Sequence, residues 1–236
     1  MRERPSPNFD ARPPGQDVDV LVLHYTGMKT AAAALDRLCD PAAEVSSHYL
    51  VEEDGTVWRL VAEEHRAWHA GTSFWRGMSG LNGRSIGIEI ANPGHEWGCL
   101  PFPPAQMAAV RDLCHAILAR HPIPARNLVA HSDIAPERKQ DPGELFDWAG
   151  LARDGIGLWP EQRDEAAPAP DRAATLLGAI GYGFAPAAEA SLADCLRAFQ
   201  RRWHPHCLSG AADPATMARL ATVARAFADT FAGGSP

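Results

Sequence analysis

The sequence lacks the signals by which several protein classes are identified. Its 236 residues include five cysteines, an odd number without a close Cys-X-X-Cys pair, which argues against a disulfide framework and against a cysteine zinc site. Reduced, mostly buried thiols are therefore expected. Long basic runs are also missing, because the longest is Arg201-Arg202, and the formal net charge is −7. Both features argue against nucleic acid as the main partner.

Long apolar runs are absent as well. No stretch of eighteen apolar residues occurs, and no apolar run precedes Val18, so neither a membrane span nor an export signal is expected. We predict a cytoplasmic protein, and the alternative is a periplasmic or envelope protein from which a leader has been removed. With 46% hydrophobic and 22% charged residues, the composition is that of an ordinary globular protein.

The chain is long enough for one full domain and a small second one. We predict a first domain over residues 1–160, in which 1–16 form an irregular arm rich in Pro, Gly and Arg, then a linker over 161–171. The second domain, 172–236, should contain three helices at about 172–180, 191–203 and 214–231. Ser191 and Asp213 are the expected N-caps of the last two helices.

In the first domain, apolar patterning predicts an α/β fold, a mixed sheet flanked by helices. The expected strands are 18–25, 47–51, 56–61, 84–92 and 127–130, of which the second and third form a hairpin. The expected helices are 29–38, 104–120 and 143–152. His24, Glu89 and His131 lie in or at the ends of strands, where α/β sheets place their chemistry.

Residues 131–143 form the most informative stretch. Pro136 and Pro142 indicate an irregular loop rather than a helix or strand. Lys139 and Asp141 are two residues apart and should project to the same side. Such a loop can hold a cation and a metal ligand in one pocket. The alternative is a solvated turn whose charges face water.

Glu89 is the second candidate. Alternation along its strand puts three isoleucines on one face and places Glu89 between Gly87 and Ala91 on the other. Burying a carboxylate in such surroundings costs free energy unless the group is paired or lines a cavity. Partial desolvation also raises its pKa towards the range of a general base. The alternative is a glutamate on the wet face of a half-exposed strand.

His24, His131 and Asp141 can together bind Zn²⁺ and leave a fourth position open. Glu89 would then move the proton and Lys139 would stabilise an oxyanion, which describes an amide hydrolase. Taken alone, His24 could equally be a core histidine. The remaining histidines considered offer other combinations: His48, His65, His69, His95, His115 and His121.

Trp68 and His69 lie side by side in a predicted loop. Such a pair is a suitable platform for a sugar or a peptide. A tryptophan that caps the core is the alternative. Glycan strand cleavage is the weaker interpretation of the whole pattern, because no second carboxylate is placed to partner Glu89.

Five sequence blocks in this order resemble the zinc N-acetylmuramoyl-L-alanine amidases of the amidase-2 type, which are related to phage T7-like amidases and animal peptidoglycan recognition proteins. The blocks are Leu23-His24-Tyr25-Thr26, Ser47-His48-Tyr49, the stretch from Ala67 to Gly71, Ser85-Ile86-Gly87-Ile88-Glu89 and the stretch from His131 to Gly143.

The resemblance implies zinc ligands His24, His131 and Asp141, with Glu89 as catalytic acid/base and Lys139 as transition-state stabiliser. His48, Trp68 and His69 would line the substrate groove. The implied reaction is hydrolysis of the amide between the lactyl group of N-acetylmuramic acid and L-alanine, and the implied partners are peptidoglycan fragments. The implied fold is a mixed sheet flanked by helices. Relatives act either on 1,6-anhydro-muropeptides in wall recycling or on intact wall, and the sequence leaves both open.

The tail resembles the three-helix peptidoglycan-binding module that is often appended to cell-wall hydrolases. The Asp-Gly that usually precedes the last helix is replaced by residues 209–213, Ser-Gly-Ala-Ala-Asp. The alternative is that the module only packs against the catalytic domain. A non-catalytic peptidoglycan receptor is the rival function. It is disfavoured because such receptors typically lack a metal ligand, and this chain keeps all three together with Glu89 and Lys139.

Overall fold

The computed structural model describes residues 1–163, 166–183 and 190–232. Its centre is a six-stranded sheet with the order β1-β5-β4-β9-β3-β10. In that order the strands are Arg2–Glu3, Val57–Arg59, Tyr49–Val51, Ser85–Ile90, Val20–Tyr25 and Leu128–Ala130. Neighbours are parallel except β4 and β5, which form the predicted antiparallel hairpin. The mixed sheet is confirmed.

The two central strands are apolar and buried on both faces. β3 reads VLVLHY and β9 reads SIGIEI, and nearly all of these positions are buried. Strands covered on both sides are typical of parallel sheets. Their register pairs His24 directly with Glu89, so the two polar residues lie side by side near the carboxyl ends of neighbouring strands.

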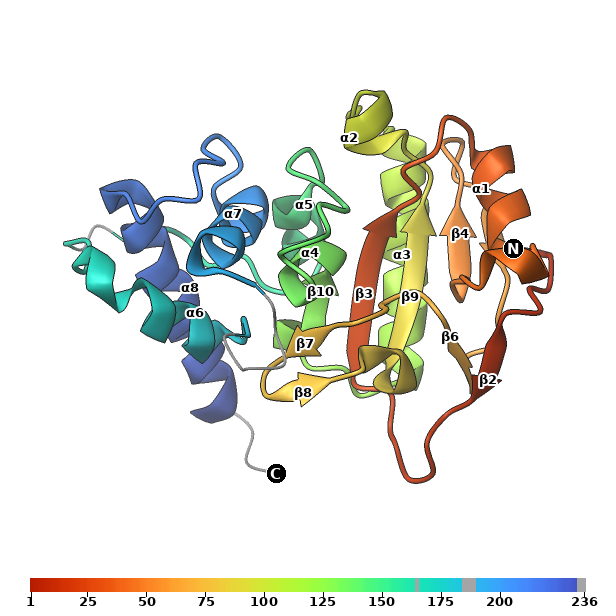
Figure 1. Cartoon of the computed structure of the whole chain (residues 1–236), viewed down its shortest axis with the longest axis horizontal. Coiled ribbons are helices and arrows are strands. Elements are labelled where there is room, and N and C mark those ends of the chain that lie inside the picture. Colours follow the sequence, from red (N-terminus) through yellow and green to blue (C-terminus); the bar gives the residue numbers. More distant parts are fainter. Residues whose placement is uncertain (164–165, 184–189, 233–236) are drawn as a thin grey trace.

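Eight α-helices surround the sheet in the described parts of the chain (Figure 1). They are α1 Ala31–Leu38, α2 Gly94–Trp97, α3 Pro104–Arg120, α4 His131–Ile134, α5 Trp148–Arg153, α6 Ala173–Ile180, α7 Leu192–Trp203 and α8 Pro214–Ala232. Short 3₁₀ helices occur at Pro41–Ala43, Leu81–Arg84, Ala125–Asn127 and Pro170–Arg172. Thr30, Asp147 and Ser191 cap helices as acceptors, and Ser191 forms a capping box with Asp194.

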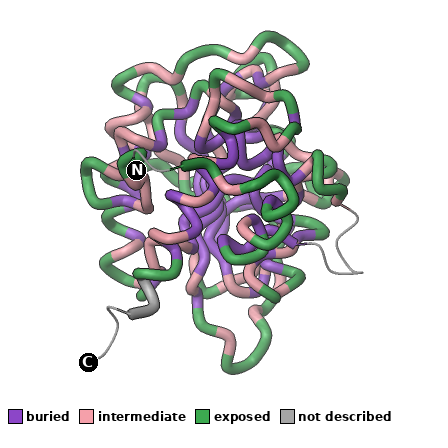
Figure 2. The backbone as a smooth tube through the Cα atoms, turned by 90° about the vertical axis from the view of Figure 1, so that its left-hand side faces the viewer, coloured by how far each residue is buried: buried purple, intermediate pink, exposed green. Residues whose placement is uncertain are grey.

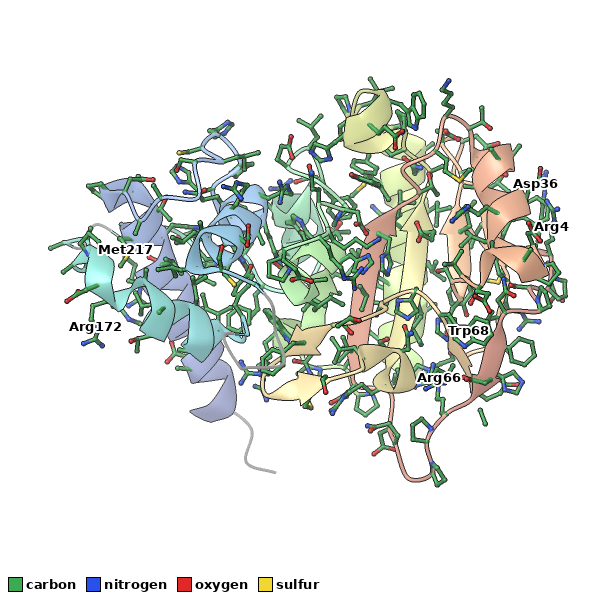
Figure 3. All side chains as sticks on the ribbon, viewed as in Figure 1. Arg4, Asp36, Arg66, Trp68, Arg172 and Met217 are labelled. Atoms are coloured by element: carbon green, nitrogen blue, oxygen red, sulfur yellow. The ribbon has the colours of Figure 1, made fainter. Side chains whose placement is uncertain are left out.

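Two predictions about irregular segments were wrong. The arm over 1–16 contains β1 and β2 (Phe9–Ala11), because its backbone pairs with β5 and with β6 (His65–Ala67). Arg4 also forms a 2.8 Å ion pair with Asp36 of α1 (Figure 3). The loop that starts at His131 begins with one helical turn, α4, because the Asp133 carboxylate accepts the Ala130 N–H and caps that turn. A small hairpin, β7 (Phe74–Trp75) with β8 (Met78–Ser79), completes the strands.

The two faces of the sheet are covered by different regions. Side chains alternate along β3, so Leu21 and Leu23 belong to the apolar cluster that contains residues of α3, while Val20 and Val22 belong to a second cluster that extends to α6, α7 and α8. Figure 2 shows the central strands as the most buried part of the molecule. The described helices of the predicted second domain therefore share one apolar cluster with the sheet. Residues 164–165 of the predicted linker and residues 184–189 and 233–236 of that domain lie outside the described residues.

All five cysteines are free, as expected, but only Cys114 and Cys195 are buried. The other three are partly exposed. Among the described residues, no helix has both the length and the apolar character needed to cross a membrane.

Candidate metal centre and active site

Three neighbouring parallel strands deliver the polar residues to one edge of the sheet. His24 and Glu89 lie near the ends of β3 and β9, and His131 is the first residue after β10. Asp141 returns to the same place from the loop that follows α4, where the Ser132 N–H donates to the Asp141 carbonyl at 3.0 Å. The candidate centre is therefore built by strand order, as ligand sites at the carboxyl ends of parallel strands are.

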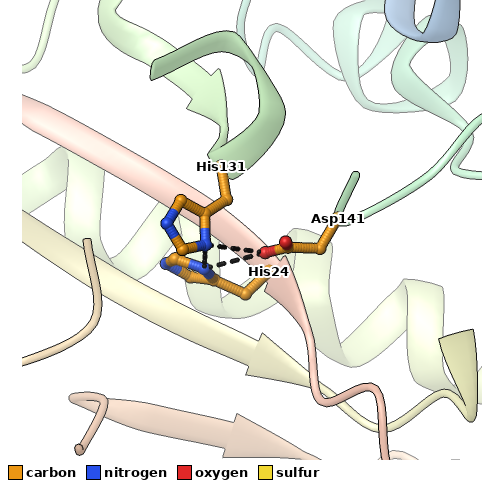
Figure 4. A group of neighbouring side chains, drawn as sticks. All are labelled: His24, His131 and Asp141. Carbon is orange, nitrogen blue, oxygen red and sulfur yellow. Dashed lines mark hydrogen bonds and ion pairs between the residues drawn. The ribbon is translucent and has the colours of Figure 1, made fainter. Parts of the chain in front are cut away.

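His24, His131 and Asp141 direct three ligand atoms at a common point (Figure 4). The Nδ1 atoms of the two histidines are 2.9 Å apart, and each lies 3.0 Å from Oδ2 of Asp141. A metal ion about 2.0–2.2 Å from each atom fits such a triangle. All three residues are buried, with exposed fractions of 1%, 4% and 6%.

The outward-facing ring nitrogens fix the tautomers of both histidines. His131 Nε2 donates to the Ala70 carbonyl at 3.2 Å. His24 Nε2 donates to His69 Nδ1 at 3.0 Å, because His69 Nε2 is occupied in donating to the Ser85 hydroxyl, which itself donates to the Leu81 carbonyl. Both Nδ1 atoms therefore present lone pairs to each other and to a carboxylate oxygen. Three converging lone pairs repel one another, so the donor set fits a cation.

The surroundings of His24 and Asp141 favour the protonation states in which these residues bind a metal ion. Burial and the nearby His131 together lower the pKa of His24 to about 4, although the Asp141 carboxylate opposes the shift. Burial alone would raise the pKa of Asp141, but the two imidazoles beside it, His131 before His24, bring that pKa below its ordinary value. A neutral His24 and an ionised Asp141 are the forms in which these two residues bind a metal ion.

Glu89 stands beside this centre with one oxygen unpaired. Its Oε2 is buried and makes no hydrogen bond. Burial raises the pKa of Glu89 well above its ordinary value, the Asp141 carboxylate raises it further and Lys139 opposes the shift. A buried, unpaired carboxyl group with a raised pKa suits proton transfer.

A cavity of about 430 Å³ opens over these residues. Glu89, His131 and Asp141 line it together with Lys139 and Trp68. The structure thus brings both predicted catalytic residues, two of the predicted ligands and two of the predicted substrate-binding residues, Trp68 and His69, to the same cavity. The third ligand, His24, lies directly beneath, in contact with the other two.

His48 lies away from the groove position predicted for it, whereas His69 lines the cavity as predicted. His48 is fully buried and does not line the cavity: its Nδ1 accepts the Gly87 N–H at 3.0 Å and its Nε2 donates to the His65 carbonyl at 3.1 Å. It joins β4 to its neighbours and is not available to a substrate. His69 reaches the cavity wall, but both of its ring nitrogens are engaged in the chain that supports His24.

Gly87 is a residue of the site that sequence reasoning noted only as small. A Cβ at this position would lie 2.5 Å from Cγ of His69. Only glycine leaves room for the imidazole that holds His24. The alternation along β9 already places Gly87 and Glu89 on the same face, but nothing in the sequence shows which side chain fills the space beside the glycine.

A family model described as N-acetylmuramoyl-L-alanine amidase matches residues 14–144. The chain is 40% identical over 224 residues to N-acetylmuramoyl-L-alanine amidase AmiD of Escherichia coli (strain K12), which covers 85% of this chain and 80% of that protein. It is 34% identical over 165 residues to 1,6-anhydro-N-acetylmuramyl-L-alanine amidase AmpD of Citrobacter freundii, which covers 63% of this chain and 86% of that protein.

Solved structures agree with these matches. The complex of AmiD from E. coli with the substrate anhydro-N-acetylmuramic acid-L-Ala-D-gamma-Glu-L-Lys superposes with a TM-score of 0.79 at 37% identity, covering 92% of this chain and 91% of that chain. AmpDh3 from Pseudomonas aeruginosa in complex with anhydromuramic pentapeptide gives 0.83 at 34% identity, covering 91% and 94%. The chain therefore belongs to the N-acetylmuramoyl-L-alanine amidase family and is an enzyme of that class.

Proposed function

We propose that this amidase is zinc-dependent and that it hydrolyses the amide between the lactyl group of 1,6-anhydro-N-acetylmuramic acid and the L-alanine of the stem peptide. The observation that carries the proposal is the convergence of three lone pairs beside an unpaired buried carboxyl group in one cavity. The substrate is chosen because AmiD and AmpDh3 are described in complexes with anhydromuramic peptides. Such a reaction belongs to cell-wall recycling.

His24, His131 and Asp141 would hold the metal. Two imidazole nitrogens and one carboxylate oxygen form the donor set of catalytic zinc sites. When bound, zinc would act as a Lewis acid towards water and towards the scissile carbonyl. The His69–Ser85–Leu81 chain and the Ala70 carbonyl orient the two imidazoles, so the donor atoms are in place before the metal arrives.

Glu89 acts as the acid/base. As a carboxylate it accepts a proton from the attacking water, and it then delivers that proton to the leaving nitrogen of L-alanine. Burial, by raising its pKa, makes the second transfer possible near neutral pH. The Lys139 ammonium, which lines the same cavity, stabilises the negative charge that develops on the carbonyl oxygen. Trp68 provides an apolar wall for the muramoyl or peptide part of the substrate.

The test is mass-spectrometric hydrolysis of a soluble anhydro-muropeptide by the purified protein as isolated, after chelation and after zinc is added back. Release of free peptide should stop with the chelator and return with zinc. Equal release in all three arms would contradict the zinc proposal. A parallel assay on intact sacculi separates the substrates, because digestion of sacculi without release from the anhydro-muropeptide would contradict the recycling substrate.

A further inference from the structure

Helix α7 directs two consecutive buried arginines at the catalytic region. Arg201 and Arg202 are 7% and 2% exposed. Successive residues on a helix point about 100° apart, so the two guanidinium groups reach different targets. In Figure 1, α7 lies beside α4 and α5, the helices on either side of the loop that carries Lys139 and Asp141.

Arg202 binds the first of these targets, the helix that begins with His131. Its Nη1 donates to Oδ2 of Asp133 at 2.6 Å, and Asp133 is fully buried. The other oxygen of the same carboxylate accepts the Tyr182 hydroxyl at 2.6 Å. The guanidinium carbon lies 4.0 Å from the ring of Trp148 in α5, so the arginine is stacked as well as paired. Both oxygens of Asp133 are therefore bound by the C-terminal region.

Arg201 faces the second target, beyond Asp141. Its Nε lies 3.6 Å from Oε2 of Glu144, which is an ion pair without a hydrogen bond. The same carboxylate oxygen accepts His95 Nε2–H at 2.9 Å, and the Tyr25 hydroxyl donates to His95 Nδ1 at 2.8 Å. Tyr25 directly follows His24, and Glu144 lies three residues after Asp141.

The two contacts hold the two ends of one segment. Asp133 lies two residues after His131, and Glu144 lies three residues after Asp141, so the attachments to α7 flank residues 134–143, which include Asp141 and most of the loop between the two metal-binding side chains. The bond from Ser132 N–H to the Asp141 carbonyl ties the ends together internally. The separation of His131 from Asp141 is therefore constrained both by this hydrogen bond within the loop and by the contacts with α7.

We propose that the C-terminal helical region positions the metal ligands: through Arg202 on Asp133 and Arg201 on Glu144, α7 holds His131 and Asp141 at the separation that the metal requires. The inference rests on the metal-binding role proposed above. It makes Arg201 and Arg202 positioning residues, since neither lines the cavity. It also assigns the C-terminal helices a task in the catalytic centre that is independent of any binding to cell wall.

The experiment compares two buried arginines of the full-length chain, Arg202→Gln and Arg219→Gln. Arg219 is 8% exposed, belongs to α8 and bonds to the carbonyls of Trp203 and Pro160 without touching the catalytic segment. Zinc affinity is measured by competition with a chelating dye, alongside Tm, kcat and KM. Loss of an outer partner of a metal ligand typically weakens metal affinity about 10–100-fold.

Because Arg202 acts on the ligands only through Asp133, Arg202→Gln should weaken zinc affinity by up to about tenfold, the lower end of that range, and lower kcat at saturating substrate with KM unchanged. Arg219→Gln should lower Tm but leave zinc affinity as in the wild type. Equal zinc affinity in the two variants would overturn the inference, because Arg202 would then serve stability alone. A wild-type protein that binds no zinc would instead overturn the metal proposal on which this inference rests.

Two milder variants keep the test usable if Arg202→Gln does not fold. Tyr182→Phe removes one hydrogen bond to Asp133 without changing the shape of the ring, and Arg201→Gln removes the contact with Glu144. Each should weaken zinc affinity by a smaller factor than Arg202→Gln. Wild-type zinc affinity in both would overturn the inference.

Discussion

The sheet region and the C-terminal helical region bury their interiors in different ways. Where β3 and β9 end, the buried side chains are polar, including His24, Asp141 and one oxygen of Glu89. The interior of the helices is mainly apolar and aromatic, as with Phe199 and Trp203 of α7. Buried polar groups destabilise a fold unless they are paired, so the unpaired Glu89 oxygen lowers the stability of the sheet region while it serves proton transfer.

The few buried charges of the C-terminal helices show where these helices contact the catalytic region. Most of their contact with the sheet is apolar, and buried charges of α7 face the catalytic segment through Arg201 and Arg202. The described helices of the C-terminal region are joined to the sheet by a common apolar cluster.

The largest effect is expected from the polar side of the comparison. Glu89→Gln should lower kcat by about 10²–10⁴-fold, because an amide cannot accept and return the proton, while zinc remains bound. Steady-state kinetics and metal analysis measure both quantities. Glu96→Gln is the control, since Glu96 also lines the cavity but is exposed to solvent. Wild-type turnover in Glu89→Gln would remove Glu89 from the mechanism.

The apolar side is tested by Phe199→Ala. Phe199 is fully buried in the cluster that the helices share with the sheet, so the substitution should destabilise the protein by about 3–5 kcal/mol. Because the cluster is common, far-UV circular dichroism and residual amidase activity should be lost in one transition. The control Leu192→Ala changes an exposed leucine of α7 and should stay within about 0.5 kcal/mol of wild type. Activity that survives after the helices have melted would show two independent units.

An intermediate effect is expected from Glu63, a paired carboxylate of the sheet region. Burial would raise its pKa, but hydrogen bonds from Arg120, His121 and Tyr49 lower it to about 2. Since the folded pKa lies below the unfolded value of about 4.5, the stabilisation is present above pH 4.5 and is lost as the pH falls towards 2.

Glu63→Gln should therefore destabilise the protein at pH 7 by about 1–2 kcal/mol, a figure reduced because Arg120 is half exposed and its charge is screened. The difference from wild type should shrink as the pH falls below 4.5. Urea unfolding at pH 7 and pH 3 measures it. A constant difference between the two pH values would mean that ionisation of Glu63 contributes nothing.

The smallest effect contrasts two glycines. Gly178 is exposed within α6, and a Cβ there would meet no atom within 4 Å, so Gly178→Ala should stabilise the protein by about 0.5–1 kcal/mol without changing activity. Gly87→Ala should do the opposite, because the new Cβ would collide with His69. Thermal unfolding of both variants provides the comparison, and destabilisation by Gly178→Ala would show that α6 is constrained by more than its described contacts.

Features that repeat with a local period could be predicted from the sequence alone. Alternation along residues 84–92 gave a buried strand with Glu89 on the small-residue face, and Ser191 with Asp194 gave the capping box of α7. These features depend on backbone geometry over a few residues. The identity of the candidate ligands was also available from the sequence, since only certain residue types can bind a metal.

The contacts that support those residues could not be predicted, because they depend on the tertiary structure. His48 turned out to hold the sheet together instead of facing substrate, because its two nitrogens meet backbone groups of β9 and of His65. Arg202 pairs with Asp133, which lies 69 residues earlier in the sequence. Such pairings depend on which helices cover which face of the sheet. The arrangement of the helices on the sheet results from burial of apolar surface across the whole fold, and no local sequence pattern predicts it.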